Sequence, residues 1–183
     1  MRIESTGGKA DYPWYASLTG SEIEQGDILR GCPVFDPPAD LTDDSETEAV
    51  FRWHRQDVII MTQSCDLVFE REKVAEVLMC PVWARSKITS GHLSTTKGLE
   101  EVRRGNMPGY HLLAAAVLPE SEREVSIVDF RRVYALPVGF VRVRATRESP
   151  RLRLLPPYRE HLSQAFARFF MRVGLPTDIP PFR

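Results

Sequence analysis

Five side chains that can take part in chemistry follow one another directly after an apolar run. Residues 58–61 are all apolar, and the next five residues are Thr62, Gln63, Ser64, Cys65 and Asp66. Cys65 is a candidate nucleophile, but a nucleophilic cysteine needs a lowered pKa and a base held beside it. The candidate bases are His54, His92 and His111.

The same cluster also has two explanations that need no nucleophile. A strand that leaves the core at residue 61 brings the polar side chains to its rim, where they can form a pocket for a base edge or a small ligand. Alternatively, Ser64 and Asp66 cap the following turn through hydrogen bonds from side chain to backbone. Cys65 is then a small, half-buried thiol at a strand end, as free cysteines commonly are.

Charge is unevenly distributed along a chain whose net charge is only −1. Residues 1–90 carry 9 Lys/Arg against 16 Asp/Glu, and residues 91–183 carry 15 against 9. Guanidinium groups bind phosphate in bidentate geometry, so the second half predicts an anion-binding face. The alternative is that its arginines pair internally with the acidic half. The candidate nucleic-acid-binding residues are Arg142, Arg144, Arg168, Arg172 and His161.

Short apolar segments separated by turn residues predict a mainly β domain with added α structure. The first strand lies within residues 23–35, the second contains the run at 58–61, which should be buried on both faces, and the third ends at Pro81. Further short β or mixed segments up to residue 145, including "GFVRVRAT", suggest a small barrel. The acidic stretch 36–48 is typical of a solvated loop.

A helix is expected near the C-terminus. The stretch "PPYREHLSQAFARFFMRVGLP" starts after two prolines and stops at a glycine, which predicts a helix over residues 157–173. Leu162, Phe166 and Phe169 share one face of it, so this face should dock on the barrel. We therefore predict an N-terminal arm over 1–22 that packs through Trp14 and Tyr15, a β-barrel domain over 23–145, and a C-terminal helix and tail over 146–183.

Composition narrows the class of protein. The 183 residues suffice for one domain with its own core, and no apolar run approaches the roughly 18 residues of a membrane helix. No secretory signal is recognisable, so we expect a cytoplasmic protein with no membrane association. Three cysteines without C-x-x-C spacing predict free thiols and no metal site, and no cofactor motif is present.

Several short motifs occur in an order that resembles the MazF/PemK family of toxin ribonucleases. They are Gly26-Asp27-Ile28 in the first strand, Arg55 just before the second, Pro81 followed by Ser86-Lys87, and Val128-Asp129 in a later strand. The resemblance covers roughly residues 23–140. It implies an SH3-like small β-barrel whose concave face grips single-stranded RNA, often as a homodimer.

The resemblance also implies residue roles. In the family, an arginine ahead of the second strand acts beside a hydroxyl residue that follows the third strand. Arg55 matches the arginine, whereas Trp83 stands at the hydroxyl position and Gln56 replaces the usual proline. The candidate catalytic residues are therefore Arg55, Ser64, Cys65 and Asp66, with Thr62, Ser64 or His54 as a proton-transfer partner.

Three functions are compatible with these observations. The first is a module directed at single-stranded RNA, acting as a metal-independent endoribonuclease of a toxin–antitoxin or bacterial defence system, with an antitoxin or another protein as partner. The second is a non-catalytic module on the same barrel that binds a ligand or a protein, which the missing hydroxyl at Trp83 favours. The third is a cysteine-dependent enzyme that uses Cys65.

Overall fold

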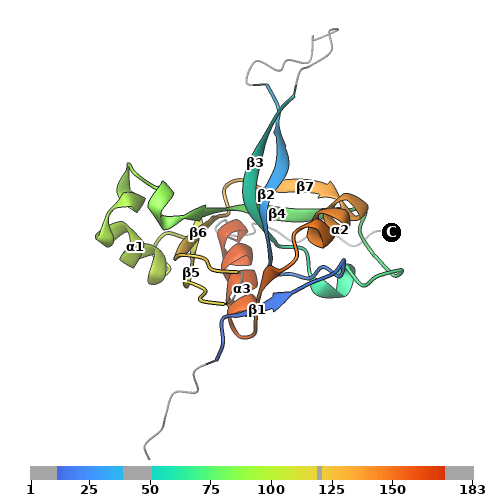
Figure 1. Cartoon of the computed structure of the whole chain (residues 1–183). Coiled ribbons are helices and arrows are strands. Elements are labelled where there is room, and N and C mark those ends of the chain that lie inside the picture. The colour runs from blue at the N-terminus through green and yellow to red at the C-terminus, as the bar shows by residue number, and fades with distance from the viewer. Residues whose placement is uncertain (1–11, 39–50, 119–120, 172–183) are drawn as a thin grey trace, which may run out of the picture.

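The computed structural model describes residues 12–38, 51–118 and 121–171, and it is mainly antiparallel β-sheet with added helices (Figure 1). This confirms the predicted fold class. The strands are β1 (Tyr15–Leu18), β2 (Asp27–Asp36), β3 (Arg52–Ile60), β4 (Glu76–Ala84), β5 (Tyr110–Leu113), β6 (Ser126–Asp129), β7 (Tyr134–Pro137) and β8 (Arg151–Leu154). The helices are α1 (Thr96–Arg103), α2 (Val138–Arg147) and α3 (Tyr158–Phe170), with short 3-10 helices η1 (Ser64–Asp66), η2 (Arg85–Lys87) and η3 (His92–Ser94). Most of the predicted acidic loop, the first eleven residues and Arg172 lie outside the described residues.

The strands pair in the order β1-β8-β2-β3-β4-β6-β5, and β7 pairs with β4 as well. Strand β4 changes partner along its length, since Glu76–Met79 pairs with β7 and Val82–Ala84 pairs with β6. Pro81 lies between these two pairings, and the strand continues past it, so the expectation that it ends the third strand was wrong. A proline is tolerated at such a point, because the hydrogen-bond ladder on that edge is already interrupted. Closure into an SH3-like barrel stays a prediction.

Two hydrophobic cores lie on opposite faces of the central strands. Val58 and Ile60 pack into a core that α2 covers, whereas Ile59 and Met61 pack into a second core that α3 covers. Successive side chains of a strand point to opposite faces, so a run without polar residues is buried on both. This confirms the prediction made for residues 58–61.

Helix α2 replaces a segment that was expected to be β or mixed. The alternation of Val and Arg in "GFVRVRAT" resembles a strand, but the buried residues are Val138, Val141, Arg142 and Ala145. Their spacing of three and four residues is that of one helix face. Burial of this face against the first core therefore decides the conformation, and the β expectation was wrong.

Both ends of the described chain pack on the second core. Strand β1 pairs with β8, and the Trp14 and Tyr158 rings stack with centroids 3.7 Å apart. Tyr15 is buried, and its hydroxyl donates to the carbonyl of Ala114 at 2.8 Å. Trp14 and Tyr15 thus pack on the body as expected, although residues 15–18 are a strand of the sheet rather than an irregular arm.

Helix α3 begins and ends close to its predicted bounds. It covers Tyr158–Phe170, and Leu162 is fully buried in the second core, with Phe166 and Phe169 partly buried beside it. The ring of Phe166 meets that of Phe130 edge-on at 5.4 Å between centroids. The predicted docking face is confirmed.

A buried ion-pair network joins β2 to β8. Asp27 is fully buried, and its carboxylate accepts from Nε of Arg151 at 3.0 Å and from both Nε and Nη2 of Arg153. Arg151 is itself 1% exposed and also donates to the carbonyls of Gly20 and Glu22. Glu24 holds the outer side of the network by pairing with Arg153 and Arg159. The Gly-Asp-Ile motif of the first strand therefore has a structural role here.

Strands β2 and β3 continue beyond the body as a two-stranded arm, which rises to the top of Figure 1. Val34, which pairs with His54, still packs in the first core and is fully buried. The opposite face of the arm carries Phe35 and Trp53, which are at least half exposed, and Phe51 just before β3 is half exposed as well. Phe35 and Trp53 are direct cross-strand partners, so they share this face.

Candidate functional site

The polar cluster at the end of β3 connects segments that are distant in sequence. Thr62 Oγ1 accepts from the Leu78 N–H at 2.7 Å, and Ser64 Oγ accepts from the Gln25 N–H at 3.2 Å. The Gln63 side chain donates to Ser163 of α3 at 3.1 Å. The hydroxyl of Ser64 thus binds the segment before β2. It does not cap its own turn, which was one of the two alternatives.

Cys65 is exposed on η1, not half-buried as predicted. Its Sγ lies 3.6 Å from Oδ1 of Asp66, and that carboxylate pairs with Lys73 at 3.4 Å. None of the candidate bases lies beside the thiol: His54 pairs with Asp36, His92 pairs with Glu101, and His111 lines a different pocket. A surface pocket of about 380 Å³ adjoins Ser64 and Cys65, and its charged members are Glu22, Glu24 and Arg142.

Arg55 lies elsewhere, on the exposed face of the arm. Its guanidinium donates to the Gly31 carbonyl at 3.2 Å and lies 6.0 Å from the centre of the Trp53 ring. It precedes Ile60, the end of β3, by five residues, and a strand rises about 3.3 Å per residue, so about 16 Å of strand separates the two. The structure therefore does not bring Arg55 together with Ser64, Cys65 and Asp66.

Two of the predicted anion-binding arginines are occupied inside the protein. Arg142 is buried, donates to the Leu67 carbonyl at 2.7 Å and to Glu72 at 2.8 Å, and lies over the Phe69 ring. Arg144 donates to the Arg30 carbonyl and lies 3.4 Å from Glu148. These two arginines therefore pair inside the protein, which was the alternative to an anion-binding face. Arg172 lies outside the described residues.

His161 and Arg168 line a pocket between α1, β5 and α3, which lie side by side in Figure 1. The pocket holds about 280 Å³. Two distant parts of the chain contribute polar groups to it: Arg103, Arg104, Tyr110, His111, His161, Gln164 and Arg168. We call it the histidine pocket, because His111 and His161 both line it.

Helices α1 and α3, which border the histidine pocket, are each positioned by specific contacts. Helix α1 begins at the Thr95 cap, whose Oγ1 accepts from the Gly98 N–H at 3.0 Å. Gly98 is required there, since a Cβ on it would come within 2.1 Å of the His92 carbonyl oxygen. Leu162 anchors α3 in the core, which leaves the neighbouring His161 exposed at the surface.

Positive charge is in excess in the histidine pocket. Arg103 and Arg104 both bind Glu100, at 2.6 and 2.7 Å, and their hydrogen bonds lower the pKa of that carboxyl to about 2. Within the described part of the chain, Arg168 has no ion-pair partner and the two imidazoles make no side-chain hydrogen bond. A pocket lined by guanidinium groups with one carboxylate between them favours an anionic ligand.

The two histidines of the pocket differ in their surroundings. His111 is half-buried beside Phe130, with 6.2 Å between ring centroids. Burial, with a smaller contribution from the charge of His161, lowers the pKa of His111 to about 4. His111 is therefore a neutral imidazole at pH 7 and a weaker base than an ordinary histidine, whereas His161 lies at the open side of the same pocket.

No family model and no curated protein matches the chain. No group of three or more His, Cys, Asp or Glu side chains is placed to hold a metal ion in residues 12–38, 51–118 and 121–171. None of the helices in these ranges is both long enough and apolar enough to cross a membrane.

Two residues of the histidine pocket were candidates from the sequence, and the others were not candidates for this site. His161 and Arg168 stood out because they flank the apolar stripe of a helix. His111 is a candidate only as a base for Cys65, and Arg103 and Arg104 are not among the candidate residues. No local sequence pattern shows that "VRRG" and "YHLL" both lie beside α3, because α3 follows them by about 50 residues.

The buried imidazole predicts a pH-dependent stability. The unfolded chain binds a proton at His111 near the ordinary pKa of 6.5, whereas the folded protein does so only near pH 4. This group therefore stabilises the fold fully above pH 6.5, and the contribution is lost as pH falls towards 4. From pH 7 to pH 5, we expect the free energy of unfolding of the wild type to fall by about 1–2 kcal/mol more than that of His111→Leu.

Urea denaturation of both proteins at the two pH values measures this shift. His92→Leu is the control, since His92 is exposed and bound to Glu101. Equal pH dependence for wild type and His111→Leu would show that His111 titrates normally in the folded protein.

Proposed function

We propose that the protein binds single-stranded RNA at the histidine pocket and cleaves it without a metal ion. One observation carries the proposal: two imidazoles, whose side chains make no hydrogen bond to another described residue, line the same cationic pocket as Arg168. The resemblance to MazF/PemK ribonucleases supports the same substrate class. The proposed site differs from the one expected from that resemblance, which was centred on Arg55.

The chemistry needs one proton acceptor and one proton donor. Neutral His111 accepts the proton of the ribose 2′-hydroxyl, and the 2′-oxygen attacks the adjacent phosphorus. The bond from phosphorus to the 5′-oxygen breaks, and His161, acting as the general acid, donates a proton to that leaving oxygen. The products are a 2′,3′-cyclic phosphate and a 5′-hydroxyl. Atoms and charge balance, and one proton has moved from His161 to His111 through the substrate.

Arginines supply the remaining requirement, which is to stabilise the charge on the phosphorane. Arg168 has no competing carboxylate among the described residues, so its guanidinium is available to the non-bridging oxygens. Arg103 and Arg104 are shared with Glu100 and add a positive field at the pocket's rim. Binding and cleavage thus use the same positive charges.

A cleavage assay tests the proposal. A fluorescent single-stranded RNA is incubated with the purified protein in EDTA, and the product ends are identified by mass spectrometry. We expect fragments with 2′,3′-cyclic phosphate ends, and no cleavage of a matched strand with 2′-O-methyl riboses. Intact RNA at all protein concentrations, or equal cleavage of both strands, would contradict the mechanism.

Arg168 makes a prediction about RNA binding that does not depend on cleavage. Each phosphate contact in a single strand contributes roughly −0.7 to the slope of log affinity against log salt concentration. Replacing Arg168 with Gln should therefore flatten the slope for 2′-O-methyl RNA by about 0.7, measured by fluorescence anisotropy. Arg147→Gln is the control, because Arg147 is exposed on α2 over the other core. Equal slopes for wild type and Arg168→Gln would remove Arg168 from the interface.

The biological setting follows from the resemblance and is part of the proposal. A cytoplasmic toxin that cleaves transcripts should arrest growth on expression, and a co-expressed antitoxin should relieve the arrest. The family is often homodimeric, so light scattering of the purified protein tests for a second copy. Growth arrest that persists in a His111→Gln, His161→Gln double variant would have another cause.

A protein-binding module is the second candidate, and the arm favours it. Phe35 and Trp53 are 50% and 59% exposed on one face of β2 and β3, and Phe51, next to the start of β3, is 51% exposed. Exposed aromatic residues grouped on one surface are typical of interaction sites. If this is the main function, Trp53→Ser should abolish partner binding, whereas the histidine variants should leave it intact.

A further inference from the structure

A second pocket adjoins the histidine pocket around the edge of the sheet. It holds about 320 Å³, and its lining includes Trp83, Lys87, Thr89, Ser90, Tyr110 and Arg131. Tyr110 lines both pockets, so they share a wall. Strand β5, which carries Tyr110, pairs with β6 alone among the described strands, so the two pockets meet at an edge of the sheet.

Register places the two pockets on opposite faces of the same strands. Trp83 is opposite Ile127 and Tyr110 is opposite Asp129, so these four side chains point to one face. His111 is opposite Val128 and points to the other face, towards α3. A ligand that fills both pockets must therefore pass around β5 at Tyr110.

We infer that Trp83 and its pocket bind a nucleobase of the RNA whose phosphate enters the histidine pocket, an inference that rests on the proposed function. Trp83 is 38% exposed, although its neighbour Val82 is buried at 2%. An exposed indole face in a polar pocket is the type of surface on which unpaired bases stack. Base and phosphate of one nucleotide are separated by a single ribose, which suits two pockets with a common wall.

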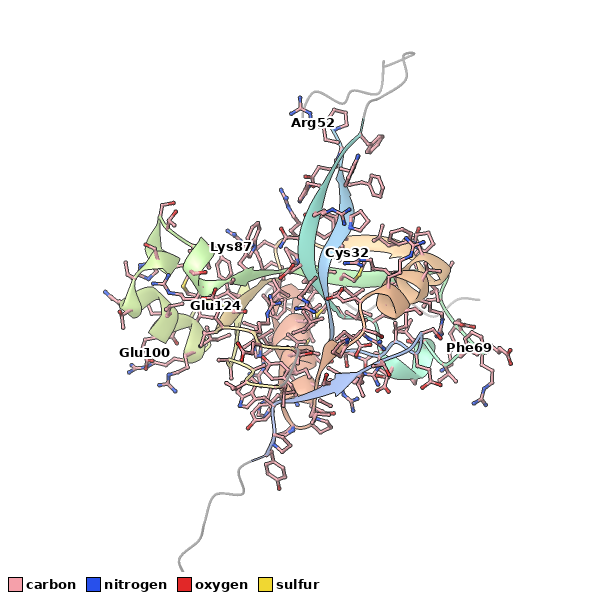
Figure 2. The ribbon with its side chains drawn as sticks, viewed as in Figure 1. Cys32, Arg52, Phe69, Lys87, Glu100 and Glu124 are labelled. Carbon is pink, nitrogen blue, oxygen red and sulfur yellow. The ribbon has the colours of Figure 1, made fainter. Side chains whose placement is uncertain are left out.

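The other groups of this pocket suit a base rather than a second phosphate. Asp129 lines it, but Arg131 pairs with that carboxylate at 2.8 Å, and the same guanidinium lies 4.5 Å from the centre of the Tyr110 ring. The charge of Arg131 is thus already used. Lys87, Thr89 and Ser90 offer donors and acceptors to the edge of a base, and Figure 2 shows Lys87 at the same end of the molecule as Glu100 of α1.

Two oligomers of equal length separate the base site from the phosphate site. One is 2′-O-methyl oligouridine, which is not cleaved, and the other is the same sugar–phosphate strand without bases. We expect Trp83→Leu to weaken binding of the oligouridine about 5- to 100-fold and to leave binding of the abasic strand unchanged, since stacking contributes about 1–3 kcal/mol per base. Trp83→Phe, which keeps an aromatic face, should lose less.

The outcomes distinguish this inference from the proposed function. If wild type binds neither strand, the proposed function fails. If both strands bind and Trp83→Leu changes them equally or not at all, the proposed function stands and the base site is overturned. Trp53→Leu is the matched control on the arm, and a selective loss of oligouridine binding in that variant instead would move base recognition to the arm. Circular dichroism verifies that each variant is folded.

Discussion

Replacing Asp27 with alanine is expected to lower the free energy of unfolding by about 3–5 kcal/mol. Asp27 is fully buried, and Arg151, its partner at 3.0 Å, is 1% exposed. Removing the carboxylate leaves two guanidinium groups, those of Arg151 and Arg153, without their shared counter-charge. A buried charge without a partner carries its full desolvation cost, whereas the backbone carbonyls of Gly20 and Glu22 offset only part of it.

Urea denaturation followed by circular dichroism measures this effect. Glu24→Gln is the control, since the Glu24 side chain is 37% exposed and an exposed pair contributes only about 0–1 kcal/mol. The double variant Asp27→Leu, Arg151→Met should be more stable than Asp27→Ala, because both charges of the pair are removed together. An Asp27→Ala variant within 1 kcal/mol of wild type would show that water reaches these arginines.

The second large effect concerns cleavage. His111→Gln and His161→Gln should each reduce kcat/KM for RNA by about 10²- to 10⁴-fold, the usual contribution of a general base or acid. Affinity for 2′-O-methyl RNA should change little, since glutamine keeps a polar group of similar reach. The double variant should be little worse than either single variant, because a proton acceptor and a proton donor act as a unit.

Two histidines outside the pocket serve as controls for the cleavage result. His92 is bound to Glu101, and His54 is bound to Asp36 on the arm. His92→Gln and His54→Gln should cleave at the wild-type rate. If His54→Gln or Arg55→Ala abolishes cleavage while the pocket variants retain it, the active site lies on the arm, as the family resemblance had implied.

Local patterns predicted those elements whose burial follows a simple period. The run at residues 58–61 was correctly predicted to be buried on both faces, because no polar residue interrupts it. Helix α3 was predicted to within three residues at its C-terminal end, because prolines and a glycine mark its limits. Helix α2 was missed, since alternating Val and Arg has the period of a strand and only tertiary burial shows which residues face inward.

The candidate site depended on long-range contacts, which a single sequence does not reveal. His161 and Arg168 were selected for charge on a helix flank, and the structure adds His111 and two arginines from other elements to the same pocket. Arg142 was selected on the same grounds, yet it pairs with Glu72 inside the protein. The sequence does not distinguish these cases, because the identity of a residue does not show whether an arginine is buried and paired or exposed.

The uneven charge of the chain has a structural explanation in several places. Arg151 and Arg153 bind Asp27, Arg159 binds Glu24, and Arg142 binds Glu72. Each pair joins an arginine of the basic second half to an acid of the first half. Internal ion pairs thus account for much of the uneven charge distribution. Arg168 remains as the arginine of α3 that is open to a ligand.

The partners of Asp27 have a consequence for the order of events during synthesis. Arg151 and β8 follow Asp27 by more than 120 residues, and β1 pairs with the same late strand. A nascent chain that has emerged only as far as β7 must keep Asp27 hydrated and leave β1 unpaired. The sheet therefore cannot be completed progressively from the N-terminus, and the ribosome must deliver the chain as far as β8 before β1 and β2 have all their partners. Nascent chains stalled before residue 150 should accordingly remain sensitive to protease.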